Sequence, residues 1–285
     1  MFLGLTRVFA YARLRLHWGF IVRQPGASAA QTAYPLPPPT TVAGAFANPL
    51  ARILGIIDSY PEKREALPVT NMFMSCVLKS TLAAAAGLAG STGVAVYEEP
   101  SRLVGSPYKG GGSFAKAVKS PIYIGSQELL PVQAVGQASA PNAEIVLAWL
   151  FDLDRLVSCS GVGAVGVEDV EAASRGVYRL GSREGLASVV DGGAVDDTKI
   201  RHLDSGPFES VLYQDSGCVI PDSPVVEIPI PSPPQYRERA YLAPASHGSG
   251  SSFVIPPPMP ARFFLKSGCR AALYPGVEGV ALAYR

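Results

Sequence analysis

Basic and aromatic side chains alternate with apolar ones near the start of the chain. Tyr11, Arg13, Arg15 and His17 would share one face of an extended strand, and Arg23 follows shortly after it. The alternate positions are apolar and would form the face that enters the core. Arginines and aromatic rings are the groups that bind phosphates and stacked bases of single-stranded RNA. The pattern therefore favours an anion-binding sheet face, although exposed arginines on a sheet are also common without a ligand.

A second basic segment surrounds three consecutive glycines. Bare glycine backbone and nearby lysines could clamp a phosphate chain, and a mobile hairpin tip is the alternative. The order of residues is not that of the nucleotide-binding P-loop, GxxxxGK[ST], so we expect no ATP site. The candidate residues in this segment are Tyr108, Lys109, Gly110, Gly111, Gly112, Lys116 and Lys119.

A third basic segment runs from Arg179 to Val189. Gly181 and Gly185 flank Ser182 and Arg183 there, between two apolar runs. Glycines at such positions mark a tight loop whose backbone can approach a ligand closely. The candidate ligand-contacting residues of this loop are Arg179, Gly181, Ser182 and Arg183.

The distribution of charge along the chain supports one anion-binding face. Net charge is only +1, but Asp58 is the first acidic residue of the chain. A second acid-free stretch extends from Arg102 to Gln127, and the acids concentrate between Asp152 and Asp197. Such asymmetry is typical of a protein that holds an anion on one face. Ordinary scatter of charges is the alternative interpretation.

The cysteines, histidines and apolar runs exclude several other classes of protein. Four cysteines lie far apart without a CxxC pair, and the chain lacks HExxH and GxSxG, so we expect no metal and no cofactor. The cysteines are expected to be buried thiols of a reducing compartment, with pairing left open. Met1–Arg7 lacks the basic start of a signal peptide, and Ser80–Tyr97 favours a buried helix leading into a strand over a membrane span. We therefore expect a cytoplasmic protein.

The elements that would position these residues alternate between strands and helices. Consecutive prolines before Thr40 and Thr41 predict a stiff arm that ends at a helix over Thr41–Leu54, with the two threonines as N-cap residues. Leu67–Thr81 favours a strand and Glu144–Leu153 a central strand. A helix follows at Glu168–Ala173, and the proline-dense remainder alternates with short strands. The fold class is therefore α+β, compatible with a ferredoxin-like sheet.

The chain resembles the Cas-five family of the RAMP superfamily, subunits of type I CRISPR effector complexes (Cascade), and in particular the archaeal type I-A branch. The most specific match is His17-Trp18-Gly19-Phe20 followed by Pro35–Ala47. Tyr108–Lys119 matches more weakly, and Arg179–Val189 is similar to the family's Arg-hydrophobic-Gly-Ser-Lys-Glu-Ser-Leu-Val-Ser-Val stretch, with Arg183 in place of lysine and Gly185 in place of serine. The match covers most of residues 11–190 and little of the C-terminal third.

The resemblance implies a ferredoxin-like palm with an inserted thumb-like hairpin. The palm would span residues 1–205 with the insertion around 100–140, and residues 206–285 would form a β-rich, proline-rich extension. It also implies a non-catalytic subunit that holds the 5′ handle of the CRISPR RNA and contacts the backbone subunit and the large, PAM-reading subunit. Contact with target DNA near the PAM is left open, and no membrane partner is implied.

The resemblance also suggests roles for individual residues. Phosphate contacts would come from Arg13, Arg15, Arg23, Lys109, Lys116, Arg179 and Arg183. His17 and Lys119 would lie in the same RNA site, and Tyr34 or Tyr108 would stack on a base. Gly110–Gly112 and Gly181-Ser182 would let the RNA approach the backbone. Thr40 and Thr41 would bind a phosphate or only cap the helix.

Two other functions remain as alternatives. Some members of the wider family cut repeat RNA without metal, and His17 could serve here as the general acid or base of such an endoribonuclease. A protein–protein scaffold without RNA contact would leave both acid-free basic segments unexplained.

Overall fold

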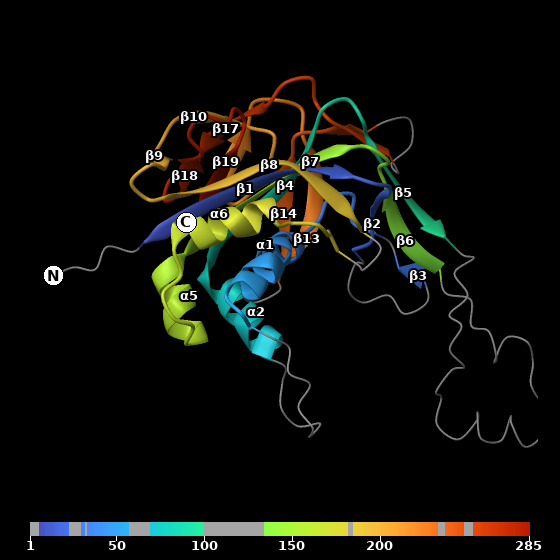
Figure 1. Cartoon of the computed structure of the whole chain (residues 1–285). Coiled ribbons are helices and arrows are strands. Elements are labelled where there is room, and N and C mark those ends of the chain that lie inside the picture. The colour runs from blue at the N-terminus through green and yellow to red at the C-terminus, as the bar shows by residue number, and fades with distance from the viewer. Residues whose placement is uncertain are drawn as a thin grey trace, which may run out of the picture.

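A four-stranded antiparallel sheet lies at the centre of the molecule (Figure 1). The computed structural model describes residues 6–22, 30–31, 33–56, 69–99, 134–181, 185–232, 237–247 and 253–285. From one edge of the sheet to the other, the strands are β4 (Thr81–Ala89), β7 (Glu144–Asp152), β1 (Arg7–Leu16) and β8 (Ala187–Asp196). The apolar segment EIVLAWLFD forms the interior strand β7, as its composition predicts, and is buried after its first residue.

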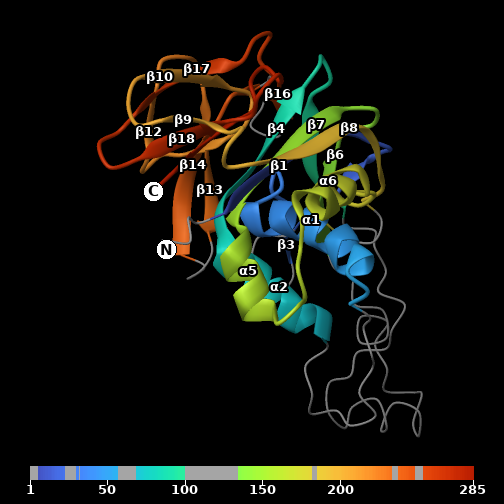
Figure 2. The same ribbon diagram turned by 60° about the vertical axis from the view of Figure 1, so that its left-hand side comes forward.

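Helices cover one face of this sheet (Figure 2). Those of the described residues are α1 (Pro39–Ile53), α2 (Val69–Ser80), α5 (Leu153–Ser160) and α6 (Val167–Arg175). The first pair of helices joins β1 to β4, and the second pair joins β7 to β8. Since β1 and β4 are both antiparallel to β7, each helical connection returns the chain to a strand of the same direction. The predicted α+β class is confirmed.

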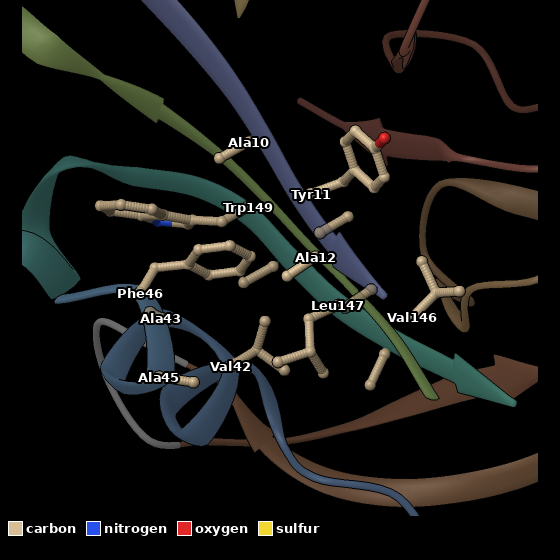
Figure 3. Close-up of a cluster of buried hydrophobic side chains, with 14 of the residues drawn as sticks. Ala10, Tyr11, Ala12, Val42, Ala43, Ala45, Phe46, Val146, Leu147 and Trp149 are labelled. Atoms are coloured by element: carbon tan, nitrogen blue, oxygen red, sulfur yellow. The ribbon is translucent and has the colours of Figure 1, made fainter. Parts of the chain in front are cut away.

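The core between α1 and the sheet follows the alternation of the strands. In Figure 3, Ala12 of β1 points toward α1, whereas Tyr11 points to the opposite side. Phe46 of α1 stacks on Trp149 of β7 with ring centroids 5.9 Å apart, and the indole Nε1 donates to Thr81 Oγ1 at 2.9 Å. Ala10, opposite Trp149 on β1, is small and leaves room for these rings, and the indole N–H finds the partner that burial requires.

The C-terminal third covers part of the other face of the sheet (Figure 1). Tyr274 contacts Phe9 and Tyr11 with ring centroids 5.6 and 4.5 Å apart. This third is built from three small antiparallel sheets, as its proline-separated strands predict. The first sheet has the order β10 (Pro207–Ser210), β17 (Ala261–Leu265) and β12 (Val219–Pro221). The second has the order β11 (Gln214–Asp215), β14 (Arg237–Ala243) and β13 (Val226–Ser232). The third has the order β19 (Ala281–Tyr284), β18 (Arg270–Leu273) and β9 (Arg201–Leu203).

A further sheet lies beside the end of β1. Its strands in order are β15 (Ser246–His247), β16 (Phe253–Ile255), β5 (Val94–Glu99), β6 (Ala134–Ser139) and β2 (Gly19–Phe20), and β3 (Ala30–Gln31) also pairs with β6. β5 and β6 are antiparallel and flank residues 100–133, which lie outside the described residues. The predicted insertion around 100–140 spans these undescribed residues and β6, and it stays a prediction. The boundary between residues 205 and 206 stays a prediction.

Two predicted elements after α1 are wrong. The expected strand Leu67–Thr81 is largely helix α2, and the expected helix within Ser80–Tyr97 is instead strand β4, followed by β5. Phe73, Cys76 and Val77 are buried whereas Ser75 is exposed, which is the i, i+3, i+4 spacing of a helix face; a strand that buried Phe73 and Val77 would bury residue 75 too. Alanine favours helices locally, but the small residues of β4 pack closely against the chain that crosses them, and this tertiary contact overrides propensity.

The four cysteines form disulfides rather than the free thiols of a reducing compartment, so the alternative left open by the sequence is the one observed. Cys76 of α2 is disulfide-bonded to Cys159 of α5, and Cys218 is bonded to Cys269, each pair with Cα atoms 5.5 Å apart. The partners are 83 and 51 residues apart in sequence. No local spacing predicts such pairs, because the fold alone brings the two thiols of each pair together.

Candidate nucleic-acid interface

The end of β1 that the C-terminal third leaves uncovered carries two exposed arginines. Arg13 and Arg15 project from the face opposite the helices, and their side chains are 46% and 52% exposed. Tyr11, the preceding position on that face, is buried against Tyr274. The strand thus offers two cations to a ligand but not the aromatic ring.

Carboxylates offset the charge of both arginines. Glu144 lies between them, with its Oε1 atom 3.0 Å from Arg15 Nη2 and its Oε2 atom 4.0 Å from Arg13 Nε. Asp191, opposite Arg13 on β8, accepts a hydrogen bond from the Tyr11 hydroxyl at 2.6 Å, and this bond lowers the pKa of the carboxyl below its ordinary value. Burial, together with the same hydrogen bond, raises the pKa of the Tyr11 phenol. This face is therefore less basic than the sequence pattern alone indicates.

His17 is exposed just beyond β1. Its Nε2 atom lies 2.9 Å from the Ser188 hydroxyl oxygen, and its backbone N–H donates to the Leu186 carbonyl at 3.2 Å. Within the described ranges, no carboxylate hydrogen-bonds to this imidazole. An exposed imidazole beside a hydroxyl could bind a phosphate oxygen or exchange a proton with a ligand.

Backbone pairing brings the first and third predicted segments together. Leu186, which binds His17, pairs with Arg179 in an antiparallel bridge, and Ile21 pairs with Gly181 in a parallel bridge. Gly181 has a φ angle of +73°, and a Cβ atom there would lie 2.6 Å from the Ile21 carbonyl oxygen. Glycine is needed at this position for both reasons. The two segments thus meet at the end of β1.

An arginine–tyrosine–arginine cluster lies next to this junction. The guanidinium carbons of Arg52 and Arg179 are 5.7 and 5.9 Å from the centre of the Tyr178 ring, and Arg52 Nη2 donates to the Tyr178 hydroxyl at 3.2 Å. The tyrosine is 40% exposed. Sequence reasoning selected Arg179 and missed the other two residues. The available signals were that Tyr178 directly precedes Arg179 and that Arg52 belongs to the acid-free start of the chain.

Three predicted site residues do not have the expected environment. Tyr34 is only 4% exposed, so its ring offers no stacking surface, contrary to the prediction. Helix α1 has Pro38 as its N-cap residue, and no side chain caps it. Thr40 and Thr41 therefore lie inside the first turn and do not cap the helix. Proline, with φ already helical, takes the first helical position at residue 39 instead.

The other predicted site residues lie outside the described residues. They are Arg23, Tyr108, Lys109, Gly110, Gly111, Gly112, Lys116, Lys119, Ser182 and Arg183. Their roles stay predictions. In the part of the chain that the structure describes, no group of three or more His, Cys, Asp or Glu side chains could hold a metal ion. None of the described helices is long and apolar enough to cross a membrane.

The other two histidines have different surroundings. In His202, Nε2 lies 3.0 Å from Asp197 Oδ1 and Nδ1 lies 3.0 Å from the Tyr284 hydroxyl, so both ring nitrogens are engaged. His247 belongs to the short strand β15. His17 thus stays the histidine of interest for acid–base chemistry.

Comparison with known proteins gives a similarity of fold. No protein-family model matches the chain, and no curated protein matches it. Among solved structures, a CRISPR protein from Archaeoglobus fulgidus is similar with a TM-score of 0.56 and 17% sequence identity, over 98% of this chain and 99% of that chain. A chain of a CRISPR RNA-guided surveillance complex is similar with a TM-score of 0.29 and 14% identity, over 77% of this chain and 72% of that chain. Of these two scores, only the first indicates a shared overall fold.

Proposed function

We propose that this protein is a non-catalytic RNA-binding subunit of a type I CRISPR surveillance complex and that it holds the 5′ handle of the CRISPR RNA, as type I-A Cas-five proteins do. The observation that carries the proposal is the junction at the end of β1. The segments of His17 and Gly181, on which the sequence resemblance rests, are far apart along the chain and are adjacent in space. A shared RNA ligand would explain why both segments contain glycine and basic residues.

The arrangement of the central sheet supports a RAMP-type palm. Its chain order is strand, helices, strand, strand, helices, strand, and its spatial order is β4-β7-β1-β8. This is the order of a ferredoxin-like sheet. The antiparallel pair β5–β6 would be the base of the inserted thumb. The fold shared with the Archaeoglobus fulgidus CRISPR protein extends over nearly the full length of both chains and supports a place in a CRISPR system.

The chemistry around the junction suits the backbone of single-stranded RNA. Proteins bind such RNA with cations that follow the phosphates and with backbone that the strand can approach. Arg13, Arg15 and Arg179 provide cations from two separate segments, and Gly181 provides close approach. The proposed protein partners are the backbone subunit and the large, PAM-reading subunit of the complex, and contact with target DNA near the PAM is a further part of the proposal.

The proposal is tested with labelled repeat-derived CRISPR RNA and a scrambled RNA of the same length. The purified chain, alone and with the backbone and large subunits, is assayed by mobility shift in buffer without metal. We expect selective binding of the repeat RNA, strengthened by the other subunits because they complete an open site. Equal binding of both RNAs in the assembled mixture would contradict the proposal and leave the scaffold interpretation.

A metal-independent endoribonuclease is the second candidate function. It is favoured by one observation, the exposed imidazole of His17 beside the Ser188 hydroxyl. The same gels detect cleavage of the repeat RNA. General acid–base catalysis contributes about 10²–10⁴ in rate, so a nuclease would lose nearly all activity in His17→Ala. Intact RNA after long incubation supports the non-catalytic function.

A further inference from the structure

We infer that Arg52, Tyr178 and Arg179 form a two-arginine phosphate clamp for single-stranded RNA, a subsite that rests on the proposed function and adds two residues to it. Arg52 comes from the last turn of α1, and the other two come from the segment that follows α6. The clamp therefore exists only where these two parts of the chain meet.

Close packing of two helices brings the members of the clamp together. A Cβ atom on Gly176, at the end of α6, would lie 3.0 Å from the Cβ atom of Pro49 in α1. The two helices lie side by side in Figure 2, and this close approach places the segment after α6 beside the end of α1. Residue 178 follows two positions later, where its hydroxyl accepts the hydrogen bond from Arg52.

The tyrosine acts as a positioning residue for both guanidinium groups. Each guanidinium carbon lies within 6 Å of the ring centre, the range of a cation–π contact. A planar guanidinium held in this way loses less freedom when it binds, and its donors match the oxygens of a phosphate. The ring itself stays 40% exposed, so a ligand can reach the group.

The charge of the clamp favours an anionic ligand. Two guanidinium groups near one ring repel each other, and no carboxylate among the described residues forms an ion pair with Arg52 or Arg179. By contrast, Arg15 and Arg239 each have a carboxylate oxygen at 3.0 Å. A phosphodiester between the two clamp arginines would offset this repulsion.

The clamp is continuous with the junction at the end of β1. Arg179 pairs with Leu186 through the backbone, and Leu186 accepts the hydrogen bond from His17. A strand of RNA that passes around the end of β1, beside His17 and Gly181, would thus reach the clamp. Single-stranded RNA is the occupant that this extended path favours, since it presents a regular row of phosphates.

The test measures how RNA affinity depends on salt for matched variants. Fluorescent oligouridine and repeat-derived RNA are titrated with the wild-type chain and with the double variant Arg52→Gln/Arg179→Gln. The control is Arg239→Gln, which removes one positive charge at an exposed, ion-paired arginine. Each phosphate contact contributes about 0.7 to the slope of log K against log salt for a single strand, so we expect the double variant to flatten the slope by about 1.4. The affinity loss between about 50 and 200 mM salt then becomes about sevenfold smaller, with no change for the control.

Variants of the tyrosine separate positioning from charge. Tyr178→Phe keeps the ring and loses only the hydroxyl that accepts from Arg52, so it should retain most of the wild-type slope. Tyr178→Leu loses the ring, so both arginines lose their support and both the affinity and the slope should fall. Melting temperatures of all variants confirm that each one is folded before RNA is added.

The outcomes distinguish the clamp from the proposed function. If the wild type prefers repeat RNA but the double variant behaves like Arg239→Gln, the clamp is overturned and the function stands. If the wild type binds oligouridine equally well and the double variant still flattens the slope, the clamp stands and handle recognition fails. If the wild type binds neither RNA, both are overturned.

Discussion

Replacing Gly87 with alanine tests whether the C-terminal third crosses the central sheet where the structure places it. Gly87 is a buried residue of β4, opposite Val146 of β7. A Cβ atom at this position would lie 1.9 Å from the carbonyl oxygen of Val211 and 2.6 Å from its carbonyl carbon. Real Cβ contacts essentially never fall below 3.0 Å, so the two chains would have to separate by about 1 Å.

The expected cost is large because the obstacle is backbone. No side-chain rotation relieves it, and the nearby chain is held by hydrogen bonds from Val211 N–H to the Gly279 carbonyl at 2.9 Å and from Tyr213 N–H to the Ala86 carbonyl at 3.0 Å. Overpacking typically costs about 1–3 kcal/mol, and we expect the upper end, about 3 kcal/mol of the free energy of unfolding. At about 2–4 °C per kcal/mol, Tm should fall by about 6–12 °C.

Gly44→Ala is the matched control. Its Cβ atom in α1 would meet only Met74 Cε at 3.6 Å, an ordinary contact. Alanine in a helix interior is more stable than glycine by about 0.5–1 kcal/mol, so this variant should melt slightly above the wild type. Both variants are compared by differential scanning calorimetry in one buffer. If Gly87→Ala melts within about 2 °C of the wild type, the C-terminal third does not dock on β4 at this point and the reasoning is refuted.

Three further perturbations test individual contacts. Tyr213→Phe removes the 2.9 Å hydrogen bond that the buried hydroxyl donates to the Pro37 carbonyl. Because that carbonyl loses its partner, the free energy of unfolding should fall by about 1–2 kcal/mol. An unchanged midpoint of unfolding in urea would argue against the contact. The pKa of Asp191 is lowered on folding, so its contribution to the free energy of unfolding is present above the ordinary value of 3.8 and is lost as pH falls through the folded value. Between about pH 5 and pH 2, the Tm of the wild type should therefore fall more than that of Tyr11→Phe, which lacks the hydrogen bond. Parallel curves of Tm against pH would be evidence against this contact. The two disulfides close segments of 83 and 51 residues, so reducing each one should lower the free energy of unfolding by about 4 kcal/mol. A Tm that is the same with and without reductant would show that the thiols are not paired.

The elements that the sequence predicts well are those with a strong local pattern. β1 alternates between buried Ala12, Leu14 and Leu16 and exposed Arg13 and Arg15, as expected for a strand with one covered face. The apolar run of β7 is interior, and the acids at the start of α6 lie in its first turn. In each of these elements the information lies within a few adjacent residues, so the periodicity of the side chains suffices.

Tertiary contacts decided the elements whose local pattern was ambiguous. The alanine-rich β4 is a strand because it pairs with β7 and passes beneath Val211, two contacts with distant parts of the chain. Disulfide pairing likewise depends on how α2 meets α5 and on how the C-terminal strands fold back on one another. A single stretch of sequence carries no signal for contacts of this kind.

The same division holds for the candidate interface. The amino-acid sequence by itself determined which segments are basic and glycine-containing, and it selected Arg13, Arg15 and Arg179 as candidates. The packing of the chain sets how available each charge is, because Glu144 on another strand partly offsets the charge of the first two, whereas Arg52 joins Arg179 from a helix more than a hundred residues away. Electrostatic and cation–π contacts depend on distance in space, and distance in space is set by the packing of the whole chain.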